Sequence, residues 1–174
     1  MKHALDVWYF TDTNAADDPV TVESNSDLER VLAEVLAHKQ FHPTVVCVKD
    51  RPTLDGPLNL PDHQLKFDVD VSHRIAAIHT MGPSSFLPAN FDVHGAVGEL
   101  PEGVMRAWVT KGSYSDSTTV GPTCSAELFV DFDTRTRFPA DAGISLEKLR
   151  EALEEFGETG LRPTCVDWQD SDVF

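Results

Sequence analysis

The sequence has few basic residues and no long hydrophobic run. Its 174 residues include 14 lysines and arginines against 29 aspartates and glutamates, which gives a formal net charge of −15 at pH 7. Proteins that bind nucleic acid or an anionic membrane directly present a basic surface, so the charge argues against both kinds of partner. No apolar run approaches the roughly 20 residues that cross a bilayer. The surplus of carboxylates instead suits the chain to a basic protein partner.

Cysteine is scarce as well. Cys47, Cys124 and Cys165 are odd in number and far apart, and no two of them form a Cys-x-x-Cys pair. We therefore expect reduced thiols, as in a cytoplasmic protein, and no disulfide framework. The first ten residues are interrupted by Asp6 and lack the apolar centre of a signal peptide, which agrees with a cytoplasmic location.

The motifs of several enzyme and cofactor classes are missing. No glycine-rich phosphate-binding loop occurs, and His38 and His42 lack the glutamate of a His-Glu-x-x-His zinc motif, so we expect neither a cofactor nor a metal. No serine lies on a Gly-x-Ser-x-Gly turn. Catalysis by Cys124 or Cys165 with a distant histidine stays open, because such residues meet in space and not in sequence.

The composition, 41% hydrophobic and 25% charged, is that of a single globular domain. Hydrophobic spacing predicts strands over residues 4–10, 45–48, 65–71, 74–80, 105–110, 124–133 and 163–169. Helices are predicted after the first strand and before the last. This order predicts an α+β fold for residues 1–174, with a mostly antiparallel sheet and two main helices packed on one side.

Both predicted helices have start signals. Ser26 is placed as an N-cap, with Glu29 three residues later to complete a capping box. The second helix begins at Ser145, whose side chain can also cap. Gly157 is the expected C-cap of this helix, because glycine readily adopts the left-handed conformation there.

Two of the predicted strands carry pairs of aspartates. Strict alternation in the third strand predicts one buried and one wet face, with Asp68 and Asp70 on the wet face. In the sixth strand Asp131 and Asp133 likewise share a face. Residues two apart on a strand point the same way, so each pair can act together.

Three interpretations of these carboxylates stay open. They can form a solvated face, an acidic patch that contacts a basic partner, or catalytic acid pairs as in glycoside hydrolysis. Tyr114, a lone aromatic residue in a polar loop, is a candidate interface anchor, although a mobile-loop interpretation stays open beside it. The candidate partner-binding residues are therefore Asp68, Asp70, Tyr114, Asp131 and Asp133.

The C-terminal third carries distinctive motifs. Residues 137–141 read Arg-Phe-Pro-Ala-Asp and lead through Ile144 into the second predicted helix, which is followed by Thr159-Gly160, Arg162-Pro163 and Val166-Asp167-Trp168-Gln169. This arrangement resembles the first family of immunity proteins of bacterial polymorphic toxin systems. Two positions depart from the family pattern, because Ser145 stands where proline is expected and Asp167 stands where glutamate is commoner.

The resemblance implies a small α+β protein that protects the producing cell by binding a cognate secreted toxin. Toxins paired with this family are often nucleic-acid-directed, deaminases and nucleases among them. Such enzymes need basic clefts, which agrees with the acidic composition. The expected function is thus a non-enzymatic inhibitor, either monomer or homodimer, whose partner is a basic protein toxin bound through the open acidic face of the sheet and neighbouring loops.

The resemblance also implies structural roles for the family motifs. The residues expected where the second helix meets the sheet are Phe138, Leu149, Leu153, Phe156 and Trp168. Two other functions stay open. An acidic mimic of nucleic acid would bind many basic proteins, and a small carboxylate-dependent hydrolase would turn over a defined substrate.

Overall fold

The main sheet is antiparallel, and in the described part of the chain its edge strands are β4 and β12. The computed structural model describes residues 1–54, 56–89, 104–112 and 127–173. The strand order is β12-β8-β7-β6-β5-β1-β4, with β11 added beside β7. The strands are β1 (Leu5–Trp8), β4 (Val20–Val22), β5 (Thr44–Val48), β6 (Gln64–Asp70), β7 (Ile75–Gly82), β8 (Arg106–Thr110), β11 (Ile144–Ser145) and β12 (Trp168–Ser171). Two smaller ribbons pair β2 (Phe10–Thr11) with β3 (Asn14–Ala15) and β9 (Phe129–Asp131) with β10 (Thr136–Arg137).

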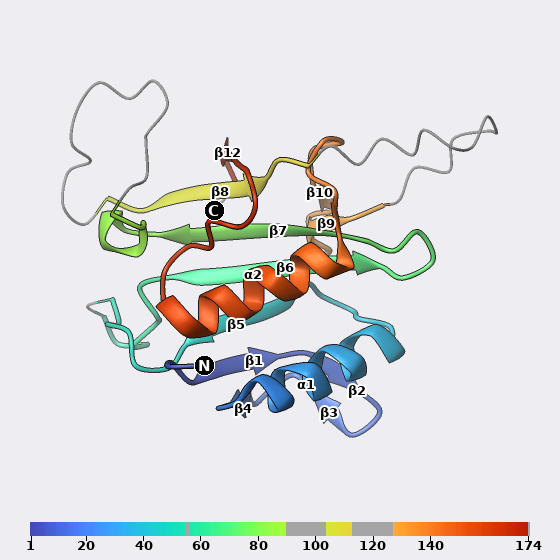
Figure 1. Ribbon diagram of the computed structural model, residues 1–174, viewed down its shortest axis with the longest axis horizontal. Helices are drawn as coiled ribbons and strands as arrows, with labels where there is room; N and C mark the ends of the chain where they lie inside the picture. The colour runs from blue at the N-terminus through green and yellow to red at the C-terminus, as the bar shows by residue number, and fades with distance from the viewer. Residues whose placement is uncertain (55, 90–103, 113–126, 174) are drawn as a thin grey trace.

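Two helices, α1 (Asn25–Ala37) and α2 (Leu146–Thr159), cover one face of the sheet, which we call the front face (Figure 1). Their buried apolar side chains meet those of the strands in the main core. A short 3-10 helix, η1 (Ser84–Phe86), follows β7. The predicted α+β fold, with two helices on one side of an antiparallel sheet, is confirmed.

The N-cap of the first helix lies two residues earlier than predicted. Ser24 is the N-cap, because its hydroxyl accepts a hydrogen bond from the backbone N–H of Asp27 at 3.2 Å and donates to the Asp27 carboxylate at 2.6 Å. The prediction of Ser26 as the cap is therefore wrong. Glu29 instead forms an ion pair with Arg150 at 2.9 Å, which joins α1 to α2.

The second helix starts as predicted and ends later. Ser145 is its N-cap and accepts a hydrogen bond from the backbone N–H of Lys148 at 3.2 Å. Gly157 is not the C-cap, because the helix continues to Thr159. Gly160 takes that role in the left-handed conformation, with φ of 66°, and its N–H donates to the carbonyl of Phe156.

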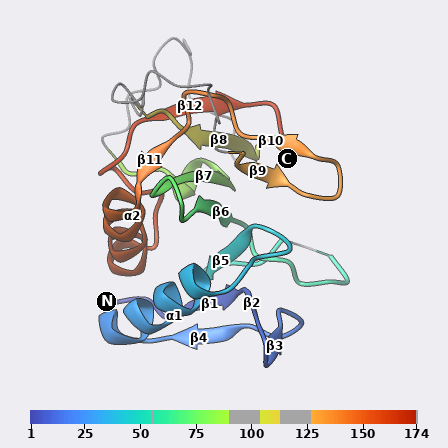
Figure 2. The same cartoon turned by 90° about the vertical axis from the view of Figure 1, so that its right-hand side faces the viewer.

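The other face of the sheet, which we call the back face, is partly covered. The β9–β10 ribbon lies over it, on the opposite side from the helices (Figure 2). A second apolar cluster fills the space beneath the ribbon and consists of Ile75, Ala77, Val109, Leu128, Val130, Phe138 and Ala142. The prediction of a wet face is therefore wrong where the ribbon covers the sheet.

The family motifs divide between the two clusters. Leu149, Leu153 and Phe156 pack where α2 meets the sheet, as expected, and Trp168 packs against the same core. Phe138 belongs instead to the back cluster, so its expected place under α2 is wrong. The residues before α2 therefore hold the ribbon against the back face.

Candidate functional site

Asp68 is a buried carboxylate that joins two strands. Its oxygens accept hydrogen bonds from the backbone N–H groups of Val69 at 2.9 Å and of Phe129, on β9, at 2.8 Å. Only 6% of the residue is exposed. Burial raises the pKa of Asp68 to about 6, against the two backbone hydrogen bonds, which lower it. Asp68 therefore attaches the ribbon to β6, and its expected exposure to solvent is wrong.

Asp68 should make stability depend on pH. Its folded pKa of about 6 lies above the ordinary 3.8, so the folded state binds the proton more tightly and stability falls as pH rises through that window. This shift corresponds to about 3 kcal/mol. In the unsubstituted protein, this contribution should lower the free energy of unfolding as the pH rises from 4 to 7. In Asp68→Asn the contribution is absent, so the free energy of unfolding should fall less, or rise more, over the same range. Urea titrations of both proteins measure this, and equal pH dependence would contradict it.

Asp70 is used within the turn between β6 and β7. Its carboxylate accepts the hydroxyl of Ser72 at 2.6 Å and the backbone N–H of His73 at 3.1 Å, and it lies 2.8 Å from Nδ1 of His73. Partial burial opposes ionisation, but these hydrogen bonds lower the pKa of Asp70 overall. The residue therefore shapes the turn.

Asp131 and Asp133 lie on the surface of the β9–β10 ribbon. Asp131 is half-buried and accepts the backbone N–H of Thr134 at 3.0 Å, which lowers the pKa of its carboxyl group. Asp133 is exposed. In the described part of the chain, neither carboxylate has a lysine or arginine within ion-pair distance. Tyr114, the fifth candidate, lies outside the described residues.

These positions separate the four aspartates by role. Asp68 and Asp70 are engaged by hydrogen bonds of β6 and the turn after it, Asp131 accepts one hydrogen bond within the ribbon, and Asp133 is exposed there. Among the described residues, no three histidine, cysteine, aspartate or glutamate side chains gather as a metal site. Burial raises the pKa of the Cys47 and Cys165 thiols to about 12, which keeps both protonated at neutral pH and therefore weakly nucleophilic. Cys124 lies outside the described residues.

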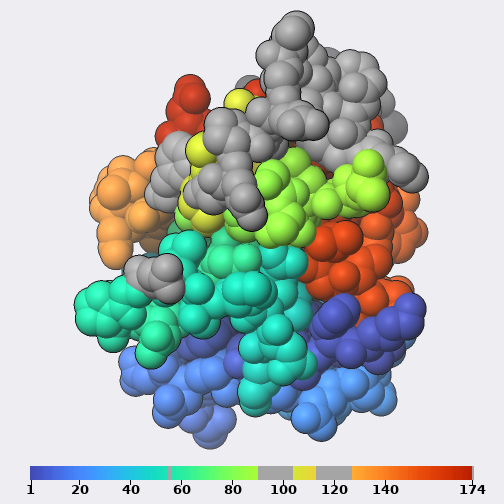
Figure 3. Space-filling model, turned by 90° about the vertical axis from the view of Figure 1, so that its left-hand side faces the viewer, coloured from blue at the N-terminus to red at the C-terminus, as the bar shows by residue number. Residues whose placement is uncertain are grey.

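A loop between β5 and β6 exposes a group of leucines. We call residues 52–54 and 56–61, the described part of this loop, the leucine loop. A bridge between Thr53 and Pro61 closes it, and the backbone N–H of Leu54 donates to the carbonyl of Leu60 at 2.7 Å. The exposed fractions are 41% for Leu54, 74% for Leu58 and 54% for Leu60. The loop projects on the same side of the sheet as the β9–β10 ribbon (Figures 2 and 3).

A buried ionic network fixes the base of the leucine loop. Arg51 donates to both carboxylate oxygens of Asp62, at 3.2 and 3.0 Å, and to the carbonyl of Gly160 at 3.3 Å. His63 lies with Nδ1 2.8 Å from Asp62, and its Nε2 accepts the backbone N–H of Val48 at 2.8 Å, which places the ring proton on Nδ1. Burial lowers the pKa of His63, so the ring is neutral at pH 7.

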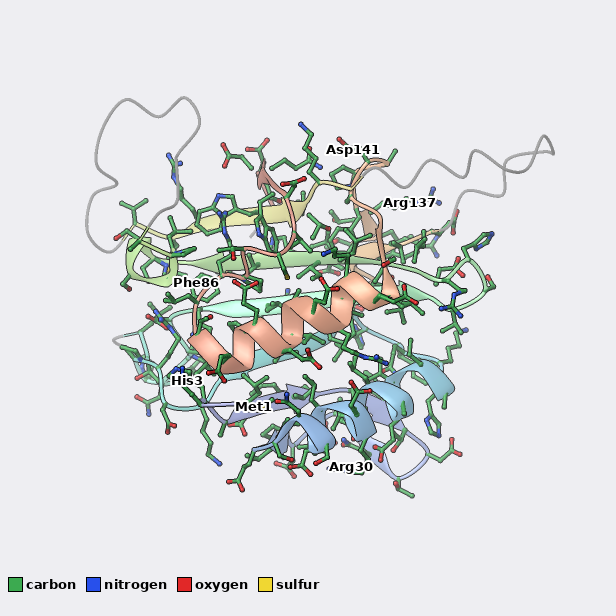
Figure 4. The ribbon with its side chains drawn as sticks, viewed as in Figure 1. Met1, His3, Arg30, Phe86, Arg137 and Asp141 are labelled. Carbon is green, nitrogen blue, oxygen red and sulfur yellow. The ribbon has the colours of Figure 1, made fainter. Side chains whose placement is uncertain are left out.

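This network joins three parts of the chain. It connects the two ends of the leucine loop to each other and, through Arg51, to the end of α2. The Arg51 guanidinium also lies 5.4 Å from the ring centroid of Phe86, which is labelled beside α2 in Figure 4. The leucine loop's prolines and glycine identify this segment as a loop but not as a contact surface. The signal for such a surface is the presence of three leucines within a proline-rich segment.

The comparisons with known proteins bear on the whole domain. A family model described as Immunity protein Imm1 matches residues 16–170. A comparison with curated protein sequences gives no match. Among the described residues, neither helix is long and apolar enough to cross a membrane. The matched range contains both helices, the leucine loop and the β9–β10 ribbon, so the chain belongs to the Imm1 family of immunity proteins.

Proposed function

We propose that this protein inhibits a nucleic-acid-directed toxin, a deaminase or a nuclease, by occluding the basic active-site cleft of that enzyme. Family membership supplies the general role, since immunity proteins bind and neutralise cognate toxins. The observation that carries the finer assignment is the net charge of −15. An enzyme that holds a nucleic acid presents lysines and arginines to phosphate groups, and an acidic protein is complementary to such a surface.

The placement of the charges supports the back side as the contact surface. On the helical side, exposed carboxylates have basic neighbours, as in the Arg150–Glu29 and Arg74–Glu147 ion pairs, both at 2.9 Å. Asp131 and Asp133 on the ribbon form no ion pair in the described part of the chain, although Lys66 is near enough to help lower the pKa of Asp131. Because neither carboxylate is neutralised by an ion pair, as Glu29 and Glu147 are, both can attract a basic partner.

Occlusion requires no chemistry from the inhibitor. A stable interface of standard size buries roughly 1,600 Å² in total, which suffices to keep a polymer out of an active-site cleft. Carboxylates around the contact accelerate the encounter and select a basic partner, and salt weakens this effect. The affinity itself depends on a few buried anchors.

Co-expression with the toxic product of the neighbouring reading frame tests the proposal. We expect restored growth, a complex that co-purifies, and inhibition of the purified toxin on a DNA or RNA substrate. A toxin that is captured but acts on another class of substrate would overturn the nucleic-acid assignment and leave the immunity role intact. Binding to unrelated basic proteins with similar affinity would favour an acidic mimic.

Charge reversal on the ribbon should slow association. We expect the double variant Asp131→Lys, Asp133→Lys to lower the association rate constant about tenfold at low salt, with a smaller change in dissociation. The matched control is Asp17→Lys, Asp18→Lys, which changes the net charge equally but lies at exposed positions before β4. Stopped-flow kinetics at several salt concentrations measure both. Equal slowing in the two variants would place the contact away from the ribbon.

A further inference from the structure

The leucine loop exposes apolar surface that the fold does not use. Half of the large apolar side chains that are most exposed in the described part of the chain lie in this one loop. Burying a leucine side chain is worth roughly 1.5–3 kcal/mol relative to leaving it in water. Grouped leucines on a protein that is otherwise strongly acidic therefore mark a surface for another molecule.

We propose that the leucine loop is the anchor of the toxin complex and that Leu58 enters an apolar pocket in or beside the basic cleft of the toxin. This inference rests on the proposed function and names the surface that performs it. Leu58 is the most exposed of the three leucines, and Leu54 and Leu60 flank it across the closed base of the loop. An anchor of this kind combines a buried apolar centre with a polar rim.

The construction of the loop favours tight binding. The bridge between Thr53 and Pro61 and the bidentate Arg51–Asp62 pair hold its two ends together. The backbone N–H of Asp62 also donates to the carbonyl of Pro52 at 3.0 Å. A loop that is ordered before binding loses less conformational entropy when the complex forms, so more of its contact energy appears as affinity.

The charge of the chain selects among the molecules that could cover these leucines. A second copy of the protein and an anionic membrane both carry negative charge, so each is repelled by a protein with a net charge of −15. A basic enzyme is attracted instead. The β9–β10 ribbon, with Asp131 and Asp133, projects on the same side of the sheet as the leucine loop, so its carboxylates add to the field that attracts a basic partner to this side (Figure 2).

The back face of the sheet adjoins the leucine loop. Trp8, Val45 and Lys66 are cross-strand neighbours on β1, β5 and β6, and all three are half-buried on the back face. They provide a mixed apolar and polar surface on β5 and β6, the two strands that the leucine loop connects, and on the neighbouring strand β1. The proposed interface therefore comprises the loop as anchor and this row, while the ribbon carboxylates contribute to the field on the same side of the sheet.

The test compares a double aspartate variant in the leucine loop with a single aspartate control outside it. The double variant Leu58→Asp, Leu60→Asp should raise the Kd for the purified cognate toxin at least about 100-fold, mainly through faster dissociation, because it removes the buried anchor. Aspartate adds negative charge, which favours a basic partner, so the loss cannot come from charge. The matched control Val71→Asp changes a side chain that is 49% exposed at the opposite end of β6, and it should leave Kd within about threefold.

The outcomes separate this inference from the proposed function. If the unsubstituted protein and the leucine double variant bind and neutralise the toxin equally well, the inference is overturned and the proposed function stands. If the unsubstituted protein does not bind the toxin, both are overturned. Hydrogen exchange on the complex adds an independent measurement, since we expect protection across residues 53–61, and unchanged exchange there contradicts the inference. A free protein that dimerises through the loop, with unchanged toxin binding in the variant, also overturns it.

Discussion

Replacing Asp62 with alanine is expected to lower the free energy of unfolding by about 3–5 kcal/mol. Its carboxylate, 9% exposed, accepts two hydrogen bonds from Arg51 and one from His63. Alanine would leave the Arg51 guanidinium, only 14% exposed, without its counter-ion, and would leave the Nδ1–H of His63 without an acceptor. Both losses carry a desolvation cost that the folded state cannot recover.

Thermal unfolding measures this effect. For a chain of this size, each kcal/mol corresponds to about 2–4 °C, so Asp62→Ala should lower the Tm by about 6–20 °C. Asp62→Asn keeps one acceptor oxygen and should lose less. Asp50→Ala, at an exposed carboxylate just before the network, is the matched control and should stay within about 0.5 kcal/mol. A Tm for Asp62→Ala equal to that of the control would show that the network contributes nothing to stability.

A second large effect is expected at Phe156, where α2 packs against the sheet. Its side chain is fully buried, and its ring lies 6.1 Å from that of Phe86, edge to face, and 5.9 Å from that of His63. Removing a buried aromatic ring costs the lost transfer energy and leaves a cavity. We expect Phe156→Ala to lower the free energy of unfolding by about 3–5 kcal/mol.

Urea unfolding distinguishes this loss of packing from a change in the unfolded chain. The midpoint should fall while the slope of the transition stays the same. Phe156→Leu retains most of the volume and should lose about 1.5 kcal/mol or less. Because Phe156 contacts His63, the double variant Asp62→Ala, Phe156→Ala should deviate from additivity by about 0.5–3 kcal/mol. Strict additivity would mean that the aromatic cluster and the ionic network act independently.

The parts of the fold that local patterns control were predictable. The alternation that begins at Leu65 identified β6, because a period of two residues is a property of the strand itself. The cap at Ser145 also follows from residues that are neighbours in sequence. At the first helix the same signal was ambiguous. Ser24 and Ser26 each precede an acidic residue by three positions, and sequence spacing does not choose between them.

The burial of Asp68 could not be predicted in this way. Alternation assigns its side chain to the second face of the strand, but the group that covers it belongs to Phe129, 61 residues later in the chain. The same holds for the Arg51–Asp62–His63 network, which depends on Gly160 at the end of α2. Interactions between distant segments decide which polar residues remain exposed on the surface. The structure therefore differs from the sequence-based prediction more in the candidate site than in the fold.

The open edges of the sheet give the acidic residues a further consequence. Among the described residues β4 and β12 have a strand neighbour on one side only, and such edges invite another strand to add to the sheet. The exposed carboxylates next to these edges are Asp17, Asp18 and Glu23 at β4, and Asp167, Asp170 and Asp172 at β12. Two such edges repel one another when copies of the chain meet. The carboxylates proposed to attract a basic partner thus also oppose edge-to-edge aggregation of the protein.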